Sequence, residues 1–314
     1  MVNVSAAMVK QLRDATGAGF LDCKKALVEN DADFEASQDW LRQKGILKVA
    51  SKSSRAASEG LVAVGSSAGG AAMSVVEINS ETDFVSRNED FQGLVRDVAD
   101  VSCVVDDGNK DTLSSTLMTN GKTVQNAISD MAAMIGENIV LRRFCRVLAL
   151  DGQVVLHYVH GQVSECVGRI AVLAVFVYEG ISDIDAIREF GKKICMHIAA
   201  SRPLALSEEE LDQEIVKKER IVLTEQAKDS GKPQEVIDKM VLGRLRKFYE
   251  ETCLLNQKFV MDPDKSVLDV ISGEGKRLGG ELSLLRFFRF EVGEGVEKES
   301  DNFADDVARQ ARGD

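Results

Sequence analysis

The sequence predicts an α+β fold divided into several subdomains. Three patterns support this prediction: short helical periodicities before residue 54, strands followed by helices occurring twice, and a charged, heptad-like stretch between Pro203 and Pro263. A length of 314 residues is enough for two or three domains. The predicted units are an N-terminal three-helix module at 1–54, two related α+β core subdomains at 55–140 and at 141–206 with 250–296, an antiparallel helical hairpin inserted at 207–249, and a C-terminal helix at 297–314.

The N-terminal module is predicted from apolar residues at helical spacing. A second helix contains Ala26 and Leu27, and a third carries Trp40 and Leu41. The apolar stripe of the first helix consists of Val4, Met8, Val9 and Leu12. These patterns predict three short helices, the first of which ends at a glycine loop over 17–19.

Each core subdomain is predicted to combine β-strands with helices that follow them. The first begins with a β-hairpin over 60–79, with its turn at Gly69-Gly70. Helical periodicity follows over 90–105 and 123–135, and Gly136 is the expected C-cap of the second helix. The second subdomain is expected to contain strands at 139–144, 154–159, 170–177 and 282–292, and a helix at 184–200.

Two charged helices, roughly 207–229 and 234–249, are predicted to form the inserted hairpin, with the turn at 230–233. Because most of their surface is charged, we expect the hairpin to project from the body instead of lying in it. The apolar residues expected between the two helices are Leu211, Ile215, Ile221 and Val222 in the first helix, and Val236, Ile237, Met240 and Leu245 in the second.

The composition limits the class of protein. A formal net charge of −12 argues against a nucleic-acid binder, which needs a basic face to neutralise phosphates. No apolar run reaches the roughly 18 residues that span a bilayer, and the first ten residues lack the features of a signal peptide. We therefore expect a cytoplasmic protein that binds neither nucleic acid nor membrane.

The cysteines and histidines give no indication of a metal site. The six cysteines are scattered without a C-x-x-C pair, and the chain has only three histidines. This excludes the common zinc spacings. We interpret the cysteines as reduced thiols, most of them in core positions, and expect neither a metal ion nor a cofactor.

The most informative stretch is residues 75–90, where a β-type run gives way to a turn before a helix begins near Asn88. The quartet Thr82-Asp83-Phe84-Val85 places a carboxylate beside a large aromatic ring on that turn. Burying such a ring is favourable by roughly 1.5–3 kcal/mol. Either Phe84 folds back into its own core, as loop aromatics often do, or it is kept for a partner. In a partner, Phe84 can displace a packed side chain while Asp83 accepts hydrogen bonds from helix N-terminal amides or a basic group.

Ordered motifs along nearly the whole chain resemble the elongation factor Ts family. The strand followed by residues 82–85 is the family's signature, and further matching segments lie on both sides of it. These segments are 12–13, 16–19, 22–27, 135–139, 142–143, 196–201, 239–241, 259–261 and 289–295. The resemblance implies a bipartite core and an N-terminal module similar to the ubiquitin-associated domain.

The same resemblance implies a function. It implies a guanine-nucleotide exchange factor, without catalytic residues, that binds elongation factor Tu in its GDP-bound and nucleotide-free states. Thr82, Asp83, Phe84 and Val85 are then expected to enter the partner close to the nucleotide's magnesium ion and to dislocate that ion. Whether the complex is a 2:2 assembly or the chain forms a homodimer stays open. Further implied contacts with the partner are Lys24, His160, Val260 and Met261.

Two other classes of function are weighed against this one. An adaptor would use the N-terminal module and the hairpin to bridge proteins, but it has no need of an aromatic wedge. An acid–base or metal enzyme would need further groups clustered with Asp83, and the nearby Glu77, Glu81 and Glu89 form no such motif. His197 lacks an acid–nucleophile constellation, so we expect a packing histidine.

Overall fold

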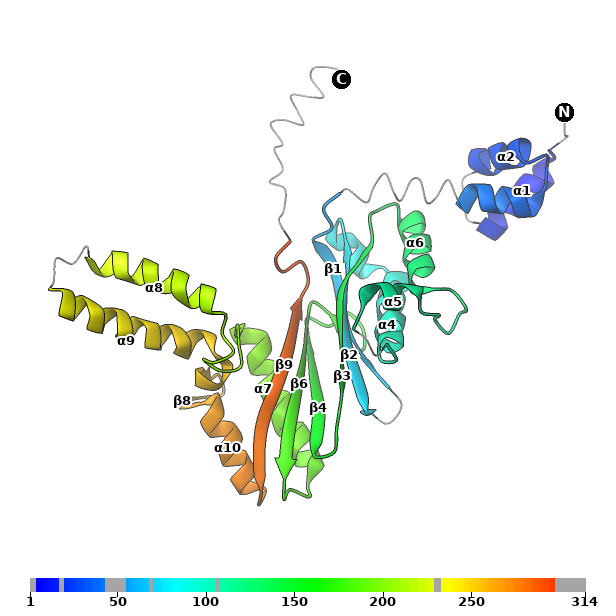
Figure 1. Ribbon diagram of the computed structural model, residues 1–314. Helices are drawn as coiled ribbons and strands as arrows, with labels where there is room; N and C mark the ends of the chain where they lie inside the picture. Colours follow the sequence, from blue (N-terminus) through cyan, green and yellow to red (C-terminus); the bar gives the residue numbers. More distant parts are fainter. Residues whose placement is uncertain are drawn as a thin grey trace.

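The computed structural model describes residues 4–16, 20–42, 55–67, 70–105, 108–228 and 233–296. Its core has four layers, in which two antiparallel sheets face each other and helices cover the outer face of each (Figure 1). The predicted α+β class is confirmed. The glycine loop at 17–19, Gly69, most of the hairpin turn at 230–233, and the C-terminal helix at 297–314 lie outside the described residues.

Three N-terminal helices share a small apolar cluster. α1 (Ala6–Thr16) and α2 (Phe20–Glu29) are followed by a third helical segment at 34–42. Ser37 in that segment donates a hydrogen bond of 3.2 Å to the carbonyl oxygen of Ala26, which holds the segment against α2. The buried side chains of the cluster are Val9, Leu12, Cys23, Ala26 and Leu27. The three predicted helices are therefore present.

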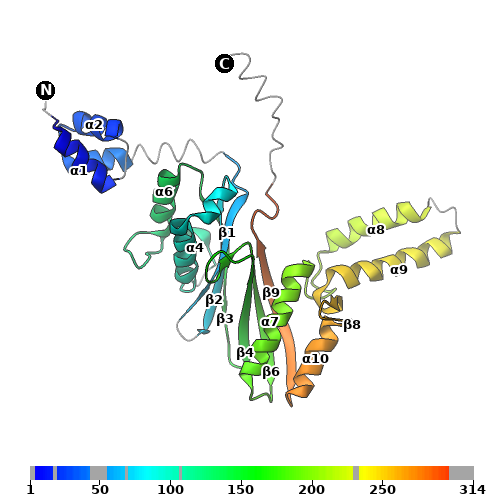
Figure 2. The ribbon, with the colours of Figure 1, turned by 180° about the vertical axis from the view of Figure 1, so that it is seen from behind.

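The first sheet has the strand order β3-β2-β1-β5, and all neighbouring strands are antiparallel. α4 packs closely on this sheet because Gly65 lacks a side chain: a Cβ there would lie 2.2 Å from the carbonyl oxygen of Ala99. α4, α5 and α6 cover one face of the sheet (Figure 1), and α4 and α6 are seen from behind in Figure 2. The elements are β1 (Glu59–Ser66), β2 (Ala72–Ser80), β3 (Val140–Leu148), β5 (Val167–Gly168), α4 (Glu89–Ser102), α5 (Lys110–Ser115) and α6 (Val124–Ile135).

The predicted β-hairpin and two of the helices after it are confirmed. β1 and β2 pair in register from Glu59 opposite Ser80 to Ser66 opposite Met73. Gly136 ends α6 with a left-handed φ of 85°, a conformation that glycine adopts without steric cost. The short helix α5 was not predicted, because its six residues are fewer than two helical turns.

The second sheet has the order β4-β6-β9, again antiparallel throughout. α7 and α10 pack on its outer face, where Phe176, Ile187 and Ile271 are buried. The elements are β4 (Gln153–His160), β6 (Ile170–Glu179), β9 (Glu281–Glu291), α7 (Ile184–Ser201) and α10 (Val267–Arg277). The strands and α7 agree with the prediction, whereas α10 was not predicted.

The two sheets are joined by an apolar layer of small, mostly β-branched side chains. On β1, Val62 and Val64 face the second sheet, while Leu61 and Ala63 face the helices. β1 is therefore buried on both faces, which explains its continuous apolar sequence. The other buried residues of this layer are Val75, Val147, Val155, Val159, Ala171, Leu173, Val175, Phe290 and Val292.

One predicted boundary does not separate the two sheets. β3 lies after residue 140, where the sequence was divided, yet it pairs with β2 along its whole length, from Val140 opposite Asn79 to Leu148 opposite Ala72. β3 therefore belongs to the first sheet, and that sheet also takes β5 from within the second predicted subdomain. The sequence of a strand does not show which sheet the strand will join, because its pairing partner lies far away in the sequence.

A buried carboxylate fastens the first sheet to the end of the second. Glu77 on β2 is fully buried, and its Oε1 accepts hydrogen bonds from Arg142 Nη1 and from the backbone N–H of Gly293, both at 2.8 Å. Its Oε2 accepts from Arg143 Nε at 2.5 Å. Because Gly293 follows β9, this one side chain links β2, β3 and the chain that leaves the second sheet.

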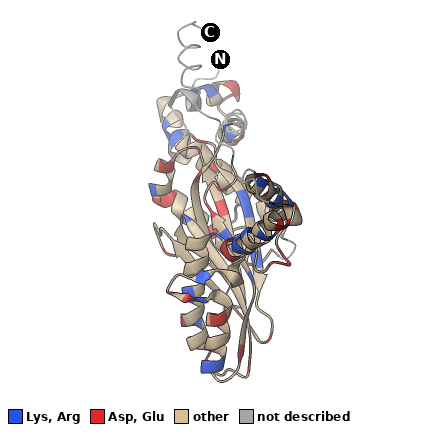
Figure 3. Cartoon of the chain, turned by 90° about the vertical axis from the view of Figure 1, so that its left-hand side faces the viewer, with Lys and Arg blue, Asp and Glu red and all other residues tan. Residues whose placement is uncertain are grey.

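The inserted helices form the expected antiparallel hairpin, which extends away from the sheets in Figures 1 and 2. α8 (Gln213–Lys228) and α9 (Gln234–Thr252) carry charged side chains along their length (Figure 3). Several of these form ion pairs within one helix, such as Lys217 with Glu214 at 2.7 Å. Such exposed pairs contribute little to stability, so the hairpin depends on its apolar seam.

The predicted seam was partly wrong. Leu211, Ile237 and Leu245 are buried as expected, and they pack with Val216, Leu223, Ala227 and Val241. Four of the residues assigned to the seam are instead exposed: Ile215, Ile221, Val222 and Val236. Neighbouring positions on a helix differ by about 100° in direction, so choosing Val222 over Leu223 selects a different face.

The remaining described segments return the chain from the hairpin to α10. They are η3 (Leu254–Asn256), β7 (Lys258–Phe259) and β8 (Asp262–Ser266). The six cysteines are reduced thiols, as predicted, and burial raises the pKa of the Cys145 and Cys195 thiols to about 12. Within the described ranges, no helix is long and apolar enough to cross a membrane.

Candidate partner-binding site

A short 3-10 turn between β2 and α4 carries the predicted quartet. This turn, η2 (Asp83–Arg87), ends at Asn88, whose side chain caps α4. Phe84 is 71% exposed, whereas the next residue, Val85, is buried in the first subdomain. The alternative in which Phe84 folds back into its own core is therefore wrong, and Val85 is a core residue that holds the turn down.

The turn is anchored by hydrogen bonds on both sides of Phe84. The backbone N–H and Oγ1 of Thr82 donate to the two carboxylate oxygens of Glu137, at 3.0 and 2.6 Å. Ser80 Oγ donates to the carbonyl oxygen of Thr82 at 2.9 Å, and Ser86 Oγ donates to that of Asp83 at 2.6 Å. The backbone that presents Phe84 is therefore fixed to the loop after α6.

The Asp83 carboxylate is exposed beside the ring and has no hydrogen-bond or ion-pair partner among the described residues. Its oxygens can therefore accept hydrogen bonds from outside the chain. In the same described part of the chain, no three His, Cys, Asp or Glu side chains are grouped so that they could hold a metal ion. The turn thus presents an aromatic ring and a carboxylate side by side at the surface.

The other predicted contact residues lie at the surface on separate elements. Lys24 is exposed on α2. His160 is exposed at the end of β4, where its Nδ1 lies 3.2 Å from the hydroxyl of Tyr158. Val260 and Met261 are each 50% exposed on the turn between β7 and β8. The structure gathers residues 82–85 into one turn and distributes the other four over three further elements.

Two contacts that support these surfaces were not predicted, although His197 is the buried packing histidine that the sequence led us to expect. Glu137 lies 55 residues after Thr82, and only the folded chain shows that its carboxylate anchors the turn. His197 lies beneath the turn at Val260, whose backbone N–H donates to His197 Nδ1 at 3.3 Å. The available signals were the position of Glu137 directly after the C-cap glycine and that of His197 on an apolar helix face.

Comparison with known proteins supplies the family. The family described as Elongation factor TS matches residues 81–294, more than half of the chain. This chain belongs to the elongation factor Ts family. The match begins just before the exposed turn and ends at Glu294, so it includes the turn and Gly293, whereas Glu77 lies before it.

Individual members of the family match the chain over nearly its full length. The Elongation factor Ts of Caulobacter vibrioides is 46% identical over 310 residues, which is 98% of each chain. That of Parvibaculum lavamentivorans is 46% identical over 313 residues and covers all of both chains. That of Sinorhizobium medicae is 47% identical over 312 residues, 99% of this chain and all of the relative. The N-terminal helices and the hairpin are therefore covered by these relatives as well.

Proposed function

We propose that this protein promotes the release of GDP from elongation factor Tu during translation elongation, by inserting Phe84 and Asp83 beside the magnesium and phosphate site. The observation that supports the proposal best is the 71% exposure of Phe84 on an anchored turn, in a chain of the elongation factor Ts family. Moving the ring from water into a partner would be favourable by roughly 1.5–3 kcal/mol. That gain is available only in the complex.

The anchored turn suits a wedge because it is ordered before the partner binds. Thr82, Ser80 and Ser86 already use their hydrogen bonds within the chain, so little further ordering is needed on association. The ring of Phe84 displaces a packed side chain of the partner, and the free Asp83 carboxylate accepts hydrogen bonds from amides or a basic group there. The displaced helices then lose the geometry that holds the magnesium ion and the β-phosphate.

Thermodynamic linkage between nucleotide binding and exchange-factor binding allows the exchange cycle to be completed. If this protein weakens nucleotide binding to elongation factor Tu by some factor, nucleotide must weaken the binding of this protein by the same factor. A fresh nucleotide can therefore expel the exchange factor. The additional contacts in this proposal are Lys24, His160, Val260 and Met261, which hold the partner while the wedge acts.

The proposal is tested by release of a fluorescent GDP analogue from elongation factor Tu. Release is measured with excess unlabelled nucleotide, with and without this chain at micromolar concentration. We expect a large acceleration that saturates with concentration. Binding without any acceleration would contradict exchange activity and would favour the adaptor interpretation.

Chelating magnesium tests the mechanism separately from the activity. If the wedge acts partly by dislocating the magnesium ion, a chelator alone should already release much of the nucleotide. Adding this chain should then accelerate release by a smaller factor than it does with magnesium present. Equal factors in both conditions would exclude dislocation of the ion as a contributor.

A further inference from the structure

His197 on α7 is fully buried beneath one of the proposed contact surfaces. Its Nε2 lies 2.9 Å from Oε1 of Gln257, and its Nδ1 accepts the backbone N–H of Val260 at 3.3 Å. The imidazole also packs against Phe259, with the ring centroids 5.7 Å apart. The histidine therefore contacts the chain on both sides of β7 through different ring atoms.

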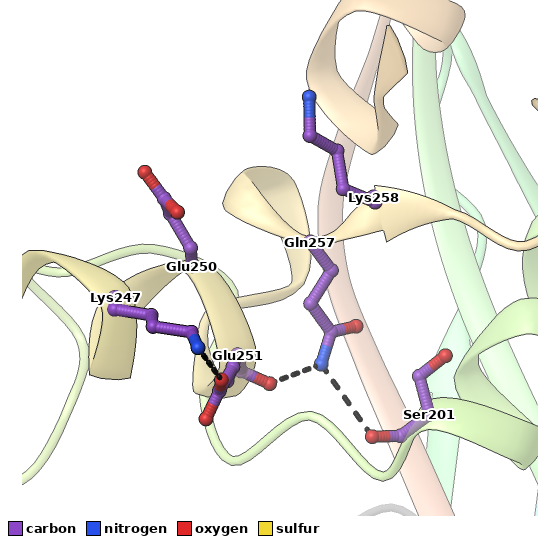
Figure 4. A pocket seen from close by; sticks show the side chains of 6 residues that line it. All are labelled: Ser201, Lys247, Glu250, Glu251, Gln257 and Lys258. Carbon is purple, nitrogen blue, oxygen red and sulfur yellow. Dashed lines mark hydrogen bonds and ion pairs between the residues drawn. The ribbon is translucent and has the colours of Figure 1, made fainter. Parts of the chain in front are cut away.

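The orientation of Gln257 fixes which ring nitrogen carries the proton. Its amide nitrogen donates to the carbonyl oxygen of Glu251 at 2.7 Å and faces that of Ser201 at 3.5 Å (Figure 4). Carbonyl oxygens only accept, so the amide must point its nitrogen at them and its Oε1 at His197. His197 Nε2 must then be the protonated nitrogen, which leaves Nδ1 as an acceptor.

An unprotonated Nδ1 has a definite use in this position. It accepts the N–H of Val260, the first residue of the turn that exposes Val260 and Met261. Burial lowers the pKa of His197, which favours the neutral ring that this contact requires. Glu251, which Gln257 binds, lies in the last turn of α9, so the same chain of contacts reaches the base of the helical hairpin.

We propose that His197 is a positioning residue for the partner contact: its Nδ1 fixes the backbone of the Val260-Met261 turn, and Gln257 fixes the ring against the base of the hairpin. The partner half of this inference rests on the proposed function, in which that turn contacts elongation factor Tu. The positioning half rests only on the contacts within this chain.

Two substitutions separate the two ring nitrogens. In His197→Asn the side-chain oxygen is one bond from Cγ, as Nδ1 is, so it can still accept the N–H of Val260. In His197→Gln the terminal amide nitrogen is two bonds from Cγ, as Nε2 is, so it can still donate to Gln257 while the acceptor for Val260 is lost. Both variants lose the ring and its contact with Phe259, so any general loss of packing is shared.

The readouts are the affinity for GDP-bound elongation factor Tu and hydrogen exchange at the amide of Val260. We expect His197→Gln to bind about fivefold more weakly than His197→Asn, as expected for one hydrogen bond of about 1 kcal/mol. The amide of Val260 should be protected in the wild type and in His197→Asn and should exchange faster in His197→Gln. Ser201→Ala is the control: its hydroxyl lies 3.4 Å from Nδ1, but its carbonyl contact with Gln257 is retained, so both readouts should stay at wild-type values.

Equal affinity for elongation factor Tu and equal hydrogen exchange at the amide of Val260 in His197→Asn and His197→Gln would overturn the inference. The wild-type protein gives an independent check that does not depend on the folding of any variant. Ring nitrogen chemical shifts should show His197 protonated at Nε2, and the opposite tautomer would also overturn it. If wild-type protein fails to bind elongation factor Tu, both the proposed function and the claim that this turn contacts the partner are wrong. Hydrogen exchange at the amide of Val260 still decides whether His197 positions the turn.

Discussion

Replacing Glu77 by glutamine is expected to destabilise the two-sheet core by about 3 kcal/mol. The side chain keeps its shape, but the charge is lost and an amide NH₂ replaces one carboxylate oxygen. Three donors face the carboxylate in the wild type, from Arg142, Arg143 and the backbone of Gly293. In the variant at least one of them must face another donor.

The size of this loss in the free energy of unfolding depends on how well Arg142 and Arg143 are solvated or paired in the variant. Removing one partner of a fully buried ion pair costs about 3–5 kcal/mol. Here Arg142 and Arg143 are partly exposed, and both keep other acceptors, which are the carbonyl oxygen of Glu294 for Arg142 and that of Glu291 for Arg143. Neither guanidinium is therefore stranded in an apolar interior, and the lower limit applies.

Urea denaturation followed by far-ultraviolet circular dichroism measures the change. The single tryptophan, Trp40, belongs to the N-terminal helices and would not report on the sheets. With an m-value of about 3 kcal/mol per molar, the midpoint should fall by about 1 M. Glu189→Gln is the matched control, because Glu189 is 80% exposed and its pair with Lys193 is 3.7 Å long. A midpoint for Glu77→Gln equal to that of the control would refute the reasoning.

Two further predictions concern acid stability and the hairpin seam. Burial lowers the pKa of His157 and His197, so the unfolded chain takes up protons at a higher pH than the folded chain does. The free energy of unfolding should therefore be highest above about pH 6.5, fall below that pH, and level off once the folded histidines also protonate. The melting temperature measured against pH follows this change. Leu223→Asp should unfold the hairpin, which would be seen as a loss of helical signal and fast amide hydrogen exchange in α8 and α9. Val222→Asp, at a position 48% exposed, should change neither readout. Equal effects of the two substitutions would contradict the assignment of Leu223 to the seam.

The exposed position of Asp83 and Phe84 could be predicted because the segment is local, whereas Val85, expected on the same surface, is buried. A strand followed by a turn with a carboxylate and a phenylalanine is a continuous segment, and the structure places Asp83 and Phe84 at the surface of one turn. What holds that turn could not be predicted, because Glu137 reaches it from 55 residues away. His197 was predicted as a packing histidine and is buried as expected, but its hydrogen-bond partners could not be predicted, because Gln257 and Val260 are 60 and 63 residues further along.

The fold predictions failed where a sequence pattern was compatible with two different structures. The apolar residues of α8 lie on adjacent faces, and only packing against α9 decides that Val216 and Leu223 form the seam. α10 contains two glycines, Gly273 and Gly275, which weaken a helical signal. Gly275 is needed there because a Cβ would lie 2.7 Å from the backbone nitrogen of Leu282, so close packing on β9 explains the residue that obscured the helix.

The central claim is that Phe84 acts on a partner and not on its own fold, and Phe84→Ala tests it most directly. GDP release from elongation factor Tu and the melting temperature are measured side by side, with Leu150→Ala as the control. Leu150 is 61% exposed and lies beyond the far end of β3, away from the turn. The account predicts that Phe84→Ala lowers the exchange rate about ten- to hundredfold at an unchanged melting temperature, while Leu150→Ala changes neither. A lower melting temperature with unchanged exchange would contradict it.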